Sequence, residues 1–419
     1  MYIPQTEAEQ SQMLADCGFA SWEALYQAIP APARIPGIPG LPPAMTEPEL
    51  LDYFTRLSEK NRNAKACFMG AGAYDHTVPA AVGALAGQSA FVTAYTPYQP
   101  EISQGTLTAI FEYQTLLTRL TGLDVSNAGM YDGATAACEA MHVAVGQTRR
   151  SKIAVTAGTH PQILETLQTY ARFAGTEVTV LPLDEETGAT PVAALEKDIA
   201  ALFVQSPNFF GVLENLPAHA DSIHQAGGLA VAVCDPLSLA LLQTPGEAGF
   251  DIAVGDCQPM GLRLSFGGPY AGYLCARESL VRRMPGRIAG ETVDRNGQRC
   301  YVLTLQTREQ HIRREKAASN ICSNQALCCL TATIWLALMG PEGLKEAATQ
   351  SARKAAYLRS LLANKGLKPK FSGRFFREFT VCGQIEGGVY LPERDCTLIA
   401  VTEKRTKAEV EAFAEGVLA

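Results

Sequence analysis

Apolar strand-like runs alternate with segments of helical periodicity through the middle of this 419-residue chain. The helical segments lie near residues 107–120, 133–147, 161–174 and 218–226. The apolar runs between and after them occupy residues 152–155, 178–181, 201–204, 229–233 and 251–254. Continuous apolar strands separated by helices are typical of a mainly parallel sheet with helices on both faces. We therefore expect an α/β protein whose large domain spans residues 61–335.

Two smaller regions flank this domain. Residues 1–60 predict a helical and proline-rich arm, because residues 30–43 carry six prolines. A capping box at the start of the following segment predicts a helix from about Glu47 to Glu59. At the other end, helical segments flank a strand-rich stretch at 375–402, which predicts a small α+β C-terminal domain over residues 336–419.

Charge and composition exclude several classes of function. The formal net charge of −7 argues against a nucleic-acid-binding surface. No apolar run approaches the roughly 20 residues that span a bilayer, and the N-terminus lacks the pattern of a secretory signal. His219 and His224 have no third ligand nearby in sequence, so we expect no metal site. These features predict a cytoplasmic protein with no membrane partner.

No lysine occurs between Lys197 and Lys316. This gap contains a buried strand ending at Asp235 and a glycine-rich turn at Gly267-Gly268-Pro269. Such a layout is that of an enzyme that uses pyridoxal phosphate (PLP), whose chemistry begins with a Schiff base to a lysine amine. A chain with this layout but without the amine is either not a PLP enzyme or is half of one.

Two polar segments are candidates for contact with a ligand. The loop at residues 95–105 is held in a non-helical path by two prolines and a glycine, and it presents tyrosine hydroxyls and amides. A rigid interface loop with packed tyrosines is the alternative. The segment 319–325 is rich in small donors and acceptors that could contact a phosphate or carboxylate, or could cap a helix. The candidate residues are Tyr95, Tyr98, Ser103, Gln104, Ser319, Asn320, Ser323 and Asn324.

A third candidate is a cofactor pocket. Small residues follow Asp132 at a helix start, where Gly133 and Thr135 could admit a phosphate to exposed N–H groups. Close helix packing is the alternative. Asp235 could pair with a pyridine nitrogen, or could cap the turn before Pro236.

Five long motifs together resemble glycine decarboxylase, the P-protein of the glycine cleavage system, and more narrowly the α subunit of its two-chain bacterial form. The motifs lie at residues 95–105, 130–136, 205–211, 265–270 and 308–325, and the resemblance runs from about residue 2 to the C-terminus. It implies the PLP-dependent transferase fold of type I, with a mainly parallel seven-stranded sheet. The region around residues 379–384 looks shortened relative to the family's small domain.

The resemblance also implies a division of labour between two chains. Gln258 stands at the position of the Schiff-base lysine, so this chain has no catalytic residue of its own and is expected to be inactive alone. Gly133, Thr135 and Asp235 would then mark a vestigial cofactor pocket. PLP is expected to be bound covalently on subunit 2 of an α2β2 heterotetramer, with the candidate residues above reaching the shared site.

The implied activity is glycine dehydrogenase (aminomethyl-transferring). Glycine is decarboxylated and its aminomethyl group passes to lipoamide on the H-protein, with the T-protein and L-protein as indirect partners. Two alternatives remain. The chain could be a structural partner that stabilises subunit 2 without lining its site. It could also be a self-sufficient PLP enzyme using Lys316, which the charged surroundings of that lysine disfavour.

Overall fold

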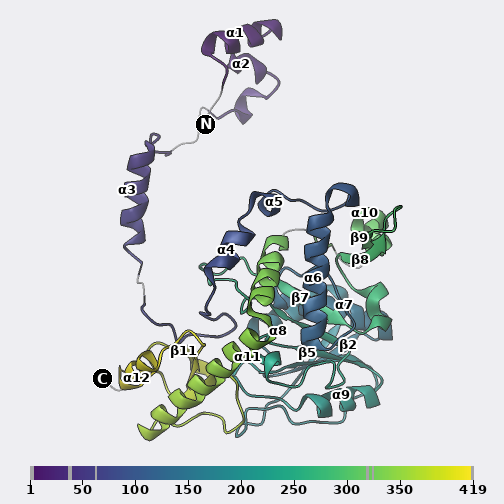
Figure 1. Cartoon of the computed structure of the whole chain (residues 1–419), viewed down its shortest axis with the longest axis vertical. Coiled ribbons are helices and arrows are strands. Elements are labelled where there is room, and N and C mark those ends of the chain that lie inside the picture. The colour runs from purple at the N-terminus through teal and green to yellow at the C-terminus, as the bar shows by residue number, and fades with distance from the viewer. Residues whose placement is uncertain (1–3, 36–39, 62–63, 318–319, 323–324, 417–419) are drawn as a thin grey trace. The chain divides into compact units, whose positions relative to one another are not determined.

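The computed structural model describes residues 4–35, 40–61, 64–317, 320–322 and 325–416 (Figure 1). The chain divides into two compact units, Met1–Lys65 and Ala66–Ala419.

The first unit is helical and has almost no core. It contains α1 (Glu7–Asp16), α2 (Trp22–Leu25), the 3-10 helix η1 (Ala31–Ala33) and α3 (Glu47–Ser58). Thr46 and Glu49 form the predicted capping box at the start of α3, which confirms that helix. Among the described residues of this unit only Leu14 is a buried hydrophobic side chain, and the apolar residues of α3 are exposed. The unit therefore gains little stability from burial of its own apolar surface.

A seven-stranded sheet organises the second unit, in the order β1-β7-β6-β5-β4-β2-β3. Its strands are β1 (Val125–Ser126), β2 (Lys152–Thr156), β3 (Glu177–Leu181), β4 (Ile199–Gln205), β5 (Leu229–Val233), β6 (Ile252–Asp256) and β7 (Gly272–Ala276). The five strands β2 to β6 are parallel where they pair, and β7 is antiparallel to both of its neighbours. The predicted strand runs are confirmed, as is the mainly parallel α/β fold.

Helices cover both faces of this sheet (Figure 1). Along β4, Ala201 and Phe203 pack with α7 (Gly133–Thr148) and α8 (Pro161–Ala174). Leu202 and Val204 point to the opposite face, which is covered by α6 (Gln104–Thr121), α9 (Leu216–Gln225) and α11 (Ala326–Asn364). Because successive strand residues point to opposite faces, a strand buried on both sides must be apolar throughout. This explains the continuous apolar runs in the sequence.

Smaller elements complete the unit. An antiparallel hairpin pairs β8 (Ile288–Val293) with β9 (Arg299–Thr304). The C-terminal part is a three-stranded antiparallel sheet in the order β10-β12-β11, as the α+β prediction requires. The remaining bounds are α4 Ala80–Ala86, α5 Ser89–Val92, α10 Gln310–Arg313, β10 Glu378–Cys382, β11 Val389–Leu391, β12 Cys396–Ala400 and α12 Lys407–Gly416. The 3-10 helices are η2 Pro100–Ile102, η3 Ser238–Ala240, η4 Glu278–Arg283, η5 Gln306–Arg308, η6 Arg314–Lys316 and η7 Pro392–Arg394.

Helix α11 qualifies the expectation about membrane spans. Within the described ranges it is the one helix long and apolar enough to cross a membrane, by length and composition alone. It is interrupted at Gly340, whose backbone is non-helical, directly before Pro341. Trp335, in its first half, is almost fully buried in the main core. These features favour a core helix of a folded protein. The helix also crosses the predicted domain boundary at 335/336, and the predicted domain limits stay a prediction.

Candidate functional site

A cavity of about 740 Å³ lies at the carboxyl edge of the parallel strands. Its walls come from the ends of β4, β5 and β6 and from the start of α7. The segments 71–74 and 376–378, the second of which leads into β10, complete the walls. In open α/β sheets this edge is where ligands bind. The candidates Gly133 and Asp235 line the cavity, whereas its lining includes no lysine among the described residues.

Gln258 is buried behind this cavity, with 1% of its surface exposed. Its Oε1 accepts a hydrogen bond from the Tyr74 backbone N–H at 2.9 Å. Its Nε2 donates to the backbone carbonyls of Tyr74 at 2.9 Å and Leu262 at 2.8 Å. The amide thus joins two chain segments and leaves none of these polar groups unsatisfied, as a buried amide requires.

Asp235 forms an ion pair within the chain. Its Oδ2 lies 2.6 Å from a terminal nitrogen of Arg377, a side chain that is 2% exposed. The Arg377 guanidinium stacks over the Tyr74 ring, 3.6 Å from its centroid. Its other terminal nitrogen lies 2.5 Å from Nε2 of His76. A buried charge such as that of Arg377 needs such a partner. Asp235 also caps the following turn, because its Oδ1 accepts from the Leu237 N–H at 3.0 Å, as the alternative expectation required.

The N-terminus of α7 faces another carboxylate. Asp132 caps the helix by accepting from the Thr135 backbone N–H at 2.7 Å, and Thr135 returns the capping-box contact. The Gly133 N–H donates to Oδ2 of Asp256 at 3.4 Å, and the Gln258 N–H donates to Oδ1 at 2.8 Å. Burial raises the pKa of Asp256 to about 7. A carboxylate therefore occupies the place where a helix N-terminus would favour a phosphate.

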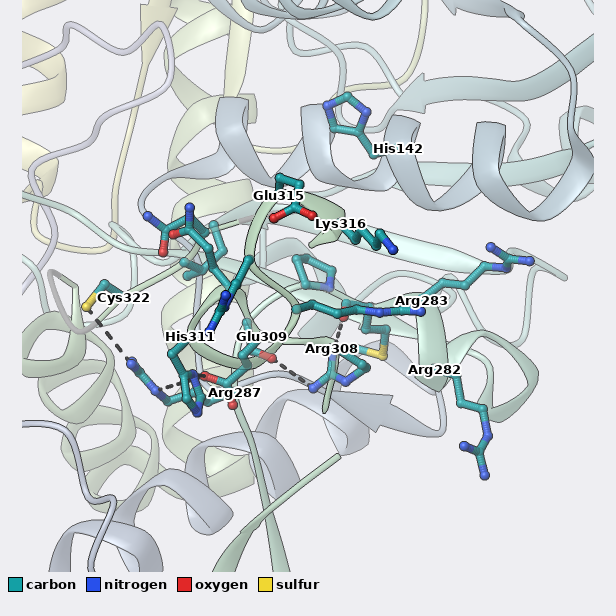
Figure 2. A pocket seen from close by; sticks show the side chains of 18 of the residues that line it. His142, Arg282, Arg283, Arg287, Arg308, Glu309, His311, Glu315, Lys316 and Cys322 are labelled. Atoms are coloured by element: carbon teal, nitrogen blue, oxygen red, sulfur yellow. Dashed lines mark hydrogen bonds and ion pairs between the residues drawn. The ribbon is translucent and has the colours of Figure 1, made fainter. Parts of the chain in front are cut away.

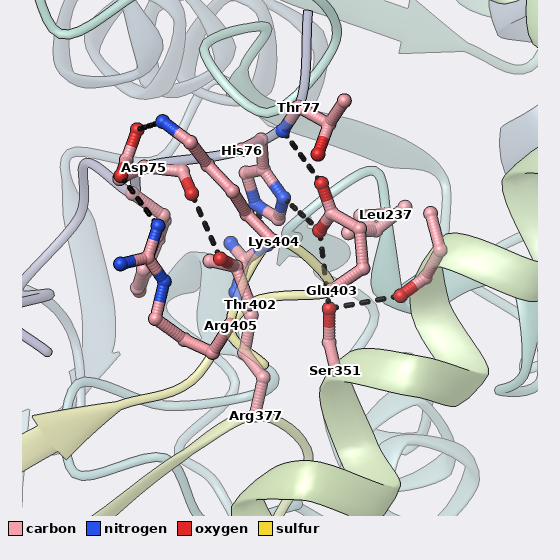
Figure 3. A network of polar contacts seen from close by, with 12 residues as sticks. Asp75, His76, Thr77, Leu237, Ser351, Arg377, Thr402, Glu403, Lys404 and Arg405 are labelled. Atoms are coloured by element: carbon pink, nitrogen blue, oxygen red, sulfur yellow. Dashed lines mark hydrogen bonds and ion pairs between the residues drawn. The ribbon is translucent and has the colours of Figure 1, made fainter. Parts of the chain in front are cut away.

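A network of polar contacts pins the segment 74–77 to the C-terminal part (Figure 3). His76 Nδ1 lies 2.6 Å from Glu403, and the Thr77 N–H donates to the same carboxylate at 2.6 Å. Burial opposes ionisation of Glu403, but the hydrogen bond and charge of His76 lower its pKa to about 2. Asp75 pairs with Lys404 at 2.7 Å and with Arg405 at 2.9 Å.

The residues of the carboxyl-edge cavity do not fit PLP, the cofactor that the fold implies. No lysine lines the cavity among the described residues. The carboxylate that would face a pyridine nitrogen is paired with Arg377, and the helix N-terminus already faces Asp256. No catalytic step through PLP is assigned to this cavity.

A second cavity, of about 810 Å³, is strongly cationic (Figure 2). Seven arginine and lysine side chains line it against two glutamates, in a chain of net charge −7. They are Arg282, Arg283, Arg287, Arg308, Arg313, Arg314 and Lys316, with Glu309 and Glu315. Two of the candidates, Tyr98 and Asn320, line this cavity together. Its field favours an anionic ligand or partner.

A third cavity, of about 460 Å³, is apolar. Arg287 lines both this apolar cavity and the cationic cavity and so connects them. Its guanidinium donates to the Tyr98 hydroxyl at 3.0 Å and lies 5.3 Å from the ring centroid. It also lies 3.5 Å from a carboxylate oxygen of Glu309. Tyr95 lines the apolar cavity and is 76% exposed. The two tyrosines of the predicted loop, Tyr95 and Tyr98, therefore line adjoining cavities.

The other candidates have different surroundings. Gln104 braces the hairpin, because its side chain donates to the Tyr301 carbonyl at 2.8 Å and accepts from the Tyr301 N–H at 2.9 Å. Ser103 is the N-cap of α6 but makes no side-chain capping bond. The Tyr131 hydroxyl donates to the Asn320 carbonyl at 3.1 Å. Ser319, Ser323 and Asn324 lie outside the described residues.

Sequence reasoning missed Tyr74, Asp256 and Arg377. Asp256 ends a strand two positions before Gln258, which is a signal that could have been used. Nothing local marks Tyr74 or Arg377, since they meet only in the folded chain. The charged run 308–316 consists of the short turns η5, α10 and η6, and it is broken at Arg314, which has a positive φ.

Comparison with known proteins gives a consistent family assignment. The sequence pattern of the glycine cleavage system P-protein family matches residues 1–415. The chain is 49% identical to the probable glycine dehydrogenase (decarboxylating) subunit 1 of Moorella thermoacetica, over 100% of both chains. It is 45% identical to the protein of the same description from Brevibacillus brevis, over 99% of this chain and 97% of the relative.

Solved structures agree. A crystal structure of glycine decarboxylase (P-protein) in inhibitor-bound form superposes with a TM-score of 0.94 at 41% identity, covering 100% of this chain and 99% of that one. The sphingosine-1-phosphate lyase of Burkholderia pseudomallei has a TM-score of 0.68 at 15% identity, with 93% of each chain covered, and shares the fold alone. The PLP-dependent fold of type I is confirmed, and the chain belongs to the glycine cleavage system P-protein family.

Proposed function

We propose that this chain is the α subunit of a two-chain glycine decarboxylase, the subunit without the Schiff-base lysine. Together with subunit 2 it decarboxylates glycine and passes the aminomethyl group to the lipoyl arm of the H-protein. The observation that carries this proposal is Gln258. An amide cannot form an imine, and this one is fully engaged by the Tyr74 backbone and the Leu262 carbonyl. The reactive amine must then come from another chain.

In this proposal PLP is held by a lysine of subunit 2 and supplies the electron sink for decarboxylation. This chain supplies binding groups from the edge of its cationic cavity. The Tyr98 hydroxyl, oriented by Arg287, and the nearby Asn320 hold the glycine carboxylate. The positive charge of the cavity attracts the carboxylate end of the glycine zwitterion. Exclusion of water around the carboxylate helps its loss as CO2, because charge disperses in the transition state.

Exposed apolar side chains support a second subunit. Tyr95 and Ile102 on the predicted loop are 76% and 80% exposed, and Leu327 and Leu338 of α11 are also exposed. Tyr95 and Leu327 line the same apolar cavity, and an exposed apolar patch is typical of a covered interface. We propose an α2β2 assembly of cytoplasmic location, which receives the lipoylated H-protein and serves the T-protein and L-protein indirectly.

Reconstitution tests the proposal. The full chain and a candidate subunit 2 are purified separately and combined, and exchange of labelled CO2 into the glycine carboxyl group is followed. We expect no exchange with this chain alone, even with added PLP, and full exchange in the mixture. Exchange by the isolated chain would overturn the proposal, as would a subunit 2 of full activity without this chain.

A further inference from the structure

The carboxyl-edge cavity has a side chain of this protein at each place where a phosphate-bearing cofactor would be anchored. We propose that Asp256 excludes phosphate-bearing ligands from this cavity, and that Arg377 and Gln258 turn it into a binding site for the chain's own segment 70–77. The inference goes beyond the proposed function, because it concerns a cavity that takes no part in the shared reaction.

Asp256 acts at the helix N-terminus. Its two carboxylate oxygens accept from the N–H groups of Gly133 and Gln258, the donors that face this corner of the cavity. Gly133 packs closely on the Asp256 backbone, because a methyl group on Gly133 would lie only 3.2 Å from the Asp256 nitrogen. A phosphate bound here would lose these donors, and above the Asp256 pKa of about 7, where this carboxyl ionises, it would also face a like charge.

Arg377 acts at the position opposite Asp235. The planar cation lies over the Tyr74 ring and is paired with the half-buried strand-end carboxylate of Asp235. A protonated pyridine ring would compete with Arg377 for this carboxylate, so in the wild-type chain Arg377 satisfies Asp235 in place of a cofactor.

The segment 70–77 fills the remaining contacts. Glu378 accepts from the Ala71 N–H and from the Tyr74 hydroxyl, both at 2.7 Å. His160 lies 3.0 Å from the Ala71 carbonyl oxygen, and Gln258 joins both backbone groups of Tyr74. His76 and Arg377 extend these contacts into the network with Glu403 (Figure 3). The cavity thus fixes the segment that leads into α4, α5 and the loop carrying Tyr95 and Tyr98.

Volume is not what excludes a cofactor. The cavity still measures about 740 Å³, within the range of sites that hold small ligands. If a cofactor is excluded by charge and by hydrogen bonds that are already formed within the chain, single substitutions can restore its binding. If side chains filled the cavity, single substitutions could not. This makes Asp256 the residue to change first.

The first experiment measures binding of inorganic phosphate and of PLP to the full chain by equilibrium dialysis. Asp256→Ser frees the Gly133 N–H and removes the charge, so we expect phosphate to bind at least about tenfold more tightly than to the wild type. Asp132→Asn is the matched control, because it removes a carboxylate from the same helix end and leaves Asp256 in place; we expect no gain. Wild-type affinity for phosphate equal to that of a folded Asp256→Ser variant overturns the proposal. Asp256→Asn, of nearly the same size, is judged by the same criterion if the serine variant does not fold.

The second experiment supplies the missing amine. Asp256→Ser combined with Gln258→Lys is incubated with PLP, reduced with borohydride and mapped by mass spectrometry. We expect a pyridoxyl group at position 258, and at least about tenfold less of it for Gln258→Lys alone. Equal labelling of the two variants, or retention of PLP by the wild-type cavity, overturns the role of Asp256. Neither readout involves glycine, so a failure here is distinct from a failure of the proposed function.

Discussion

The two polar cavities of this protein differ in how their charges are balanced. At the carboxyl edge, Asp235 is paired with Arg377, and Glu378 and Gln258 are hydrogen-bonded to the segment 71–74. In the cationic cavity, arginines and lysines outnumber glutamates, and Asn320 is exposed. A cavity whose charged groups are paired within the chain stabilises the fold. A cavity with excess charge is suited to something that arrives from outside.

The largest effect is expected from Arg377→Ala. It leaves Asp235 without its cation and removes the group stacked on Tyr74. Breaking a buried ion pair from one side costs about 3–5 kcal/mol. Urea denaturation should show this loss, while Arg314→Ala in the cationic cavity should change the free energy of unfolding by less than about 1 kcal/mol. Equal losses for the two variants would remove the distinction between the cavities.

Next in size is the pH dependence caused by Asp256. Burial raises its pKa from 3.8 to about 7, so between these values the folded state binds more protons than the unfolded state. The free energy of unfolding therefore falls as pH rises through this window, by about 4 kcal/mol at about 1.4 kcal/mol per pKa unit. Asp256→Asn should lack this part of the decline. Parallel stability curves for the two proteins from pH 4 to pH 7 would contradict the burial of this carboxylate.

Tyr98→Phe tests the cationic cavity. It removes the hydroxyl that accepts from Arg287 at 3.0 Å. A hydrogen bond to a charged group contributes roughly 1.5–3 kcal/mol, so loss of the proposed bond from Tyr98 to the glycine carboxylate should lower kcat/KM for glycine in the reconstituted complex about tenfold or more. Tyr95→Phe, which alters the adjoining apolar cavity, should have less effect. Full activity of the Tyr98→Phe, Asn320→Ala double variant would favour the purely structural role.

The smallest effect is expected from Gln104→Ala. Its amide bonds both backbone groups of Tyr301 in β9, and loss of these contacts should cost about 1–2 kcal/mol. Thermal unfolding measures this cost. Among the described residues, the side-chain hydrogen bonds of Gln104 go to the hairpin and the Pro100 carbonyl, so kcat/KM should not change. If the variant lost activity while its stability stayed normal, Gln104 would belong to the binding site and the prediction would be wrong.

The fold was predictable where local pattern decides it. Continuous apolar runs marked β2, β4, β5 and β6 because these strands are buried on both faces, and they marked β3 although this edge strand is partly exposed. Thr46 with Glu49 marked the start of α3. The two-residue β1 carries no comparable signal, and the apolar run of β7 does not show that this strand is antiparallel. Asp235 was predicted to be a strand-end carboxylate. Its partner Arg377 lies more than a hundred residues away in the sequence, directly before β10. Such pairings depend on how the three-stranded sheet packs against the seven-stranded sheet, and the periodicity of apolar residues in the sequence does not encode this packing.

For Gln258, the sequence predicted the position but not the contacts. Its position was assigned through the family resemblance, whereas its contact with Tyr74 required the structure. The candidate segment 319–324 was partly testable, since Asn320 lies in the cationic cavity while three neighbours lie outside the described residues.

The central claim is that this chain contributes binding groups and no cofactor chemistry. Borohydride reduction of the PLP-loaded complex, followed by peptide mapping of both chains, tests it most directly. We predict a pyridoxyl group on a lysine of subunit 2 and none on this chain. A stoichiometric pyridoxyl group on any lysine of this chain, Lys316 included, would contradict the account.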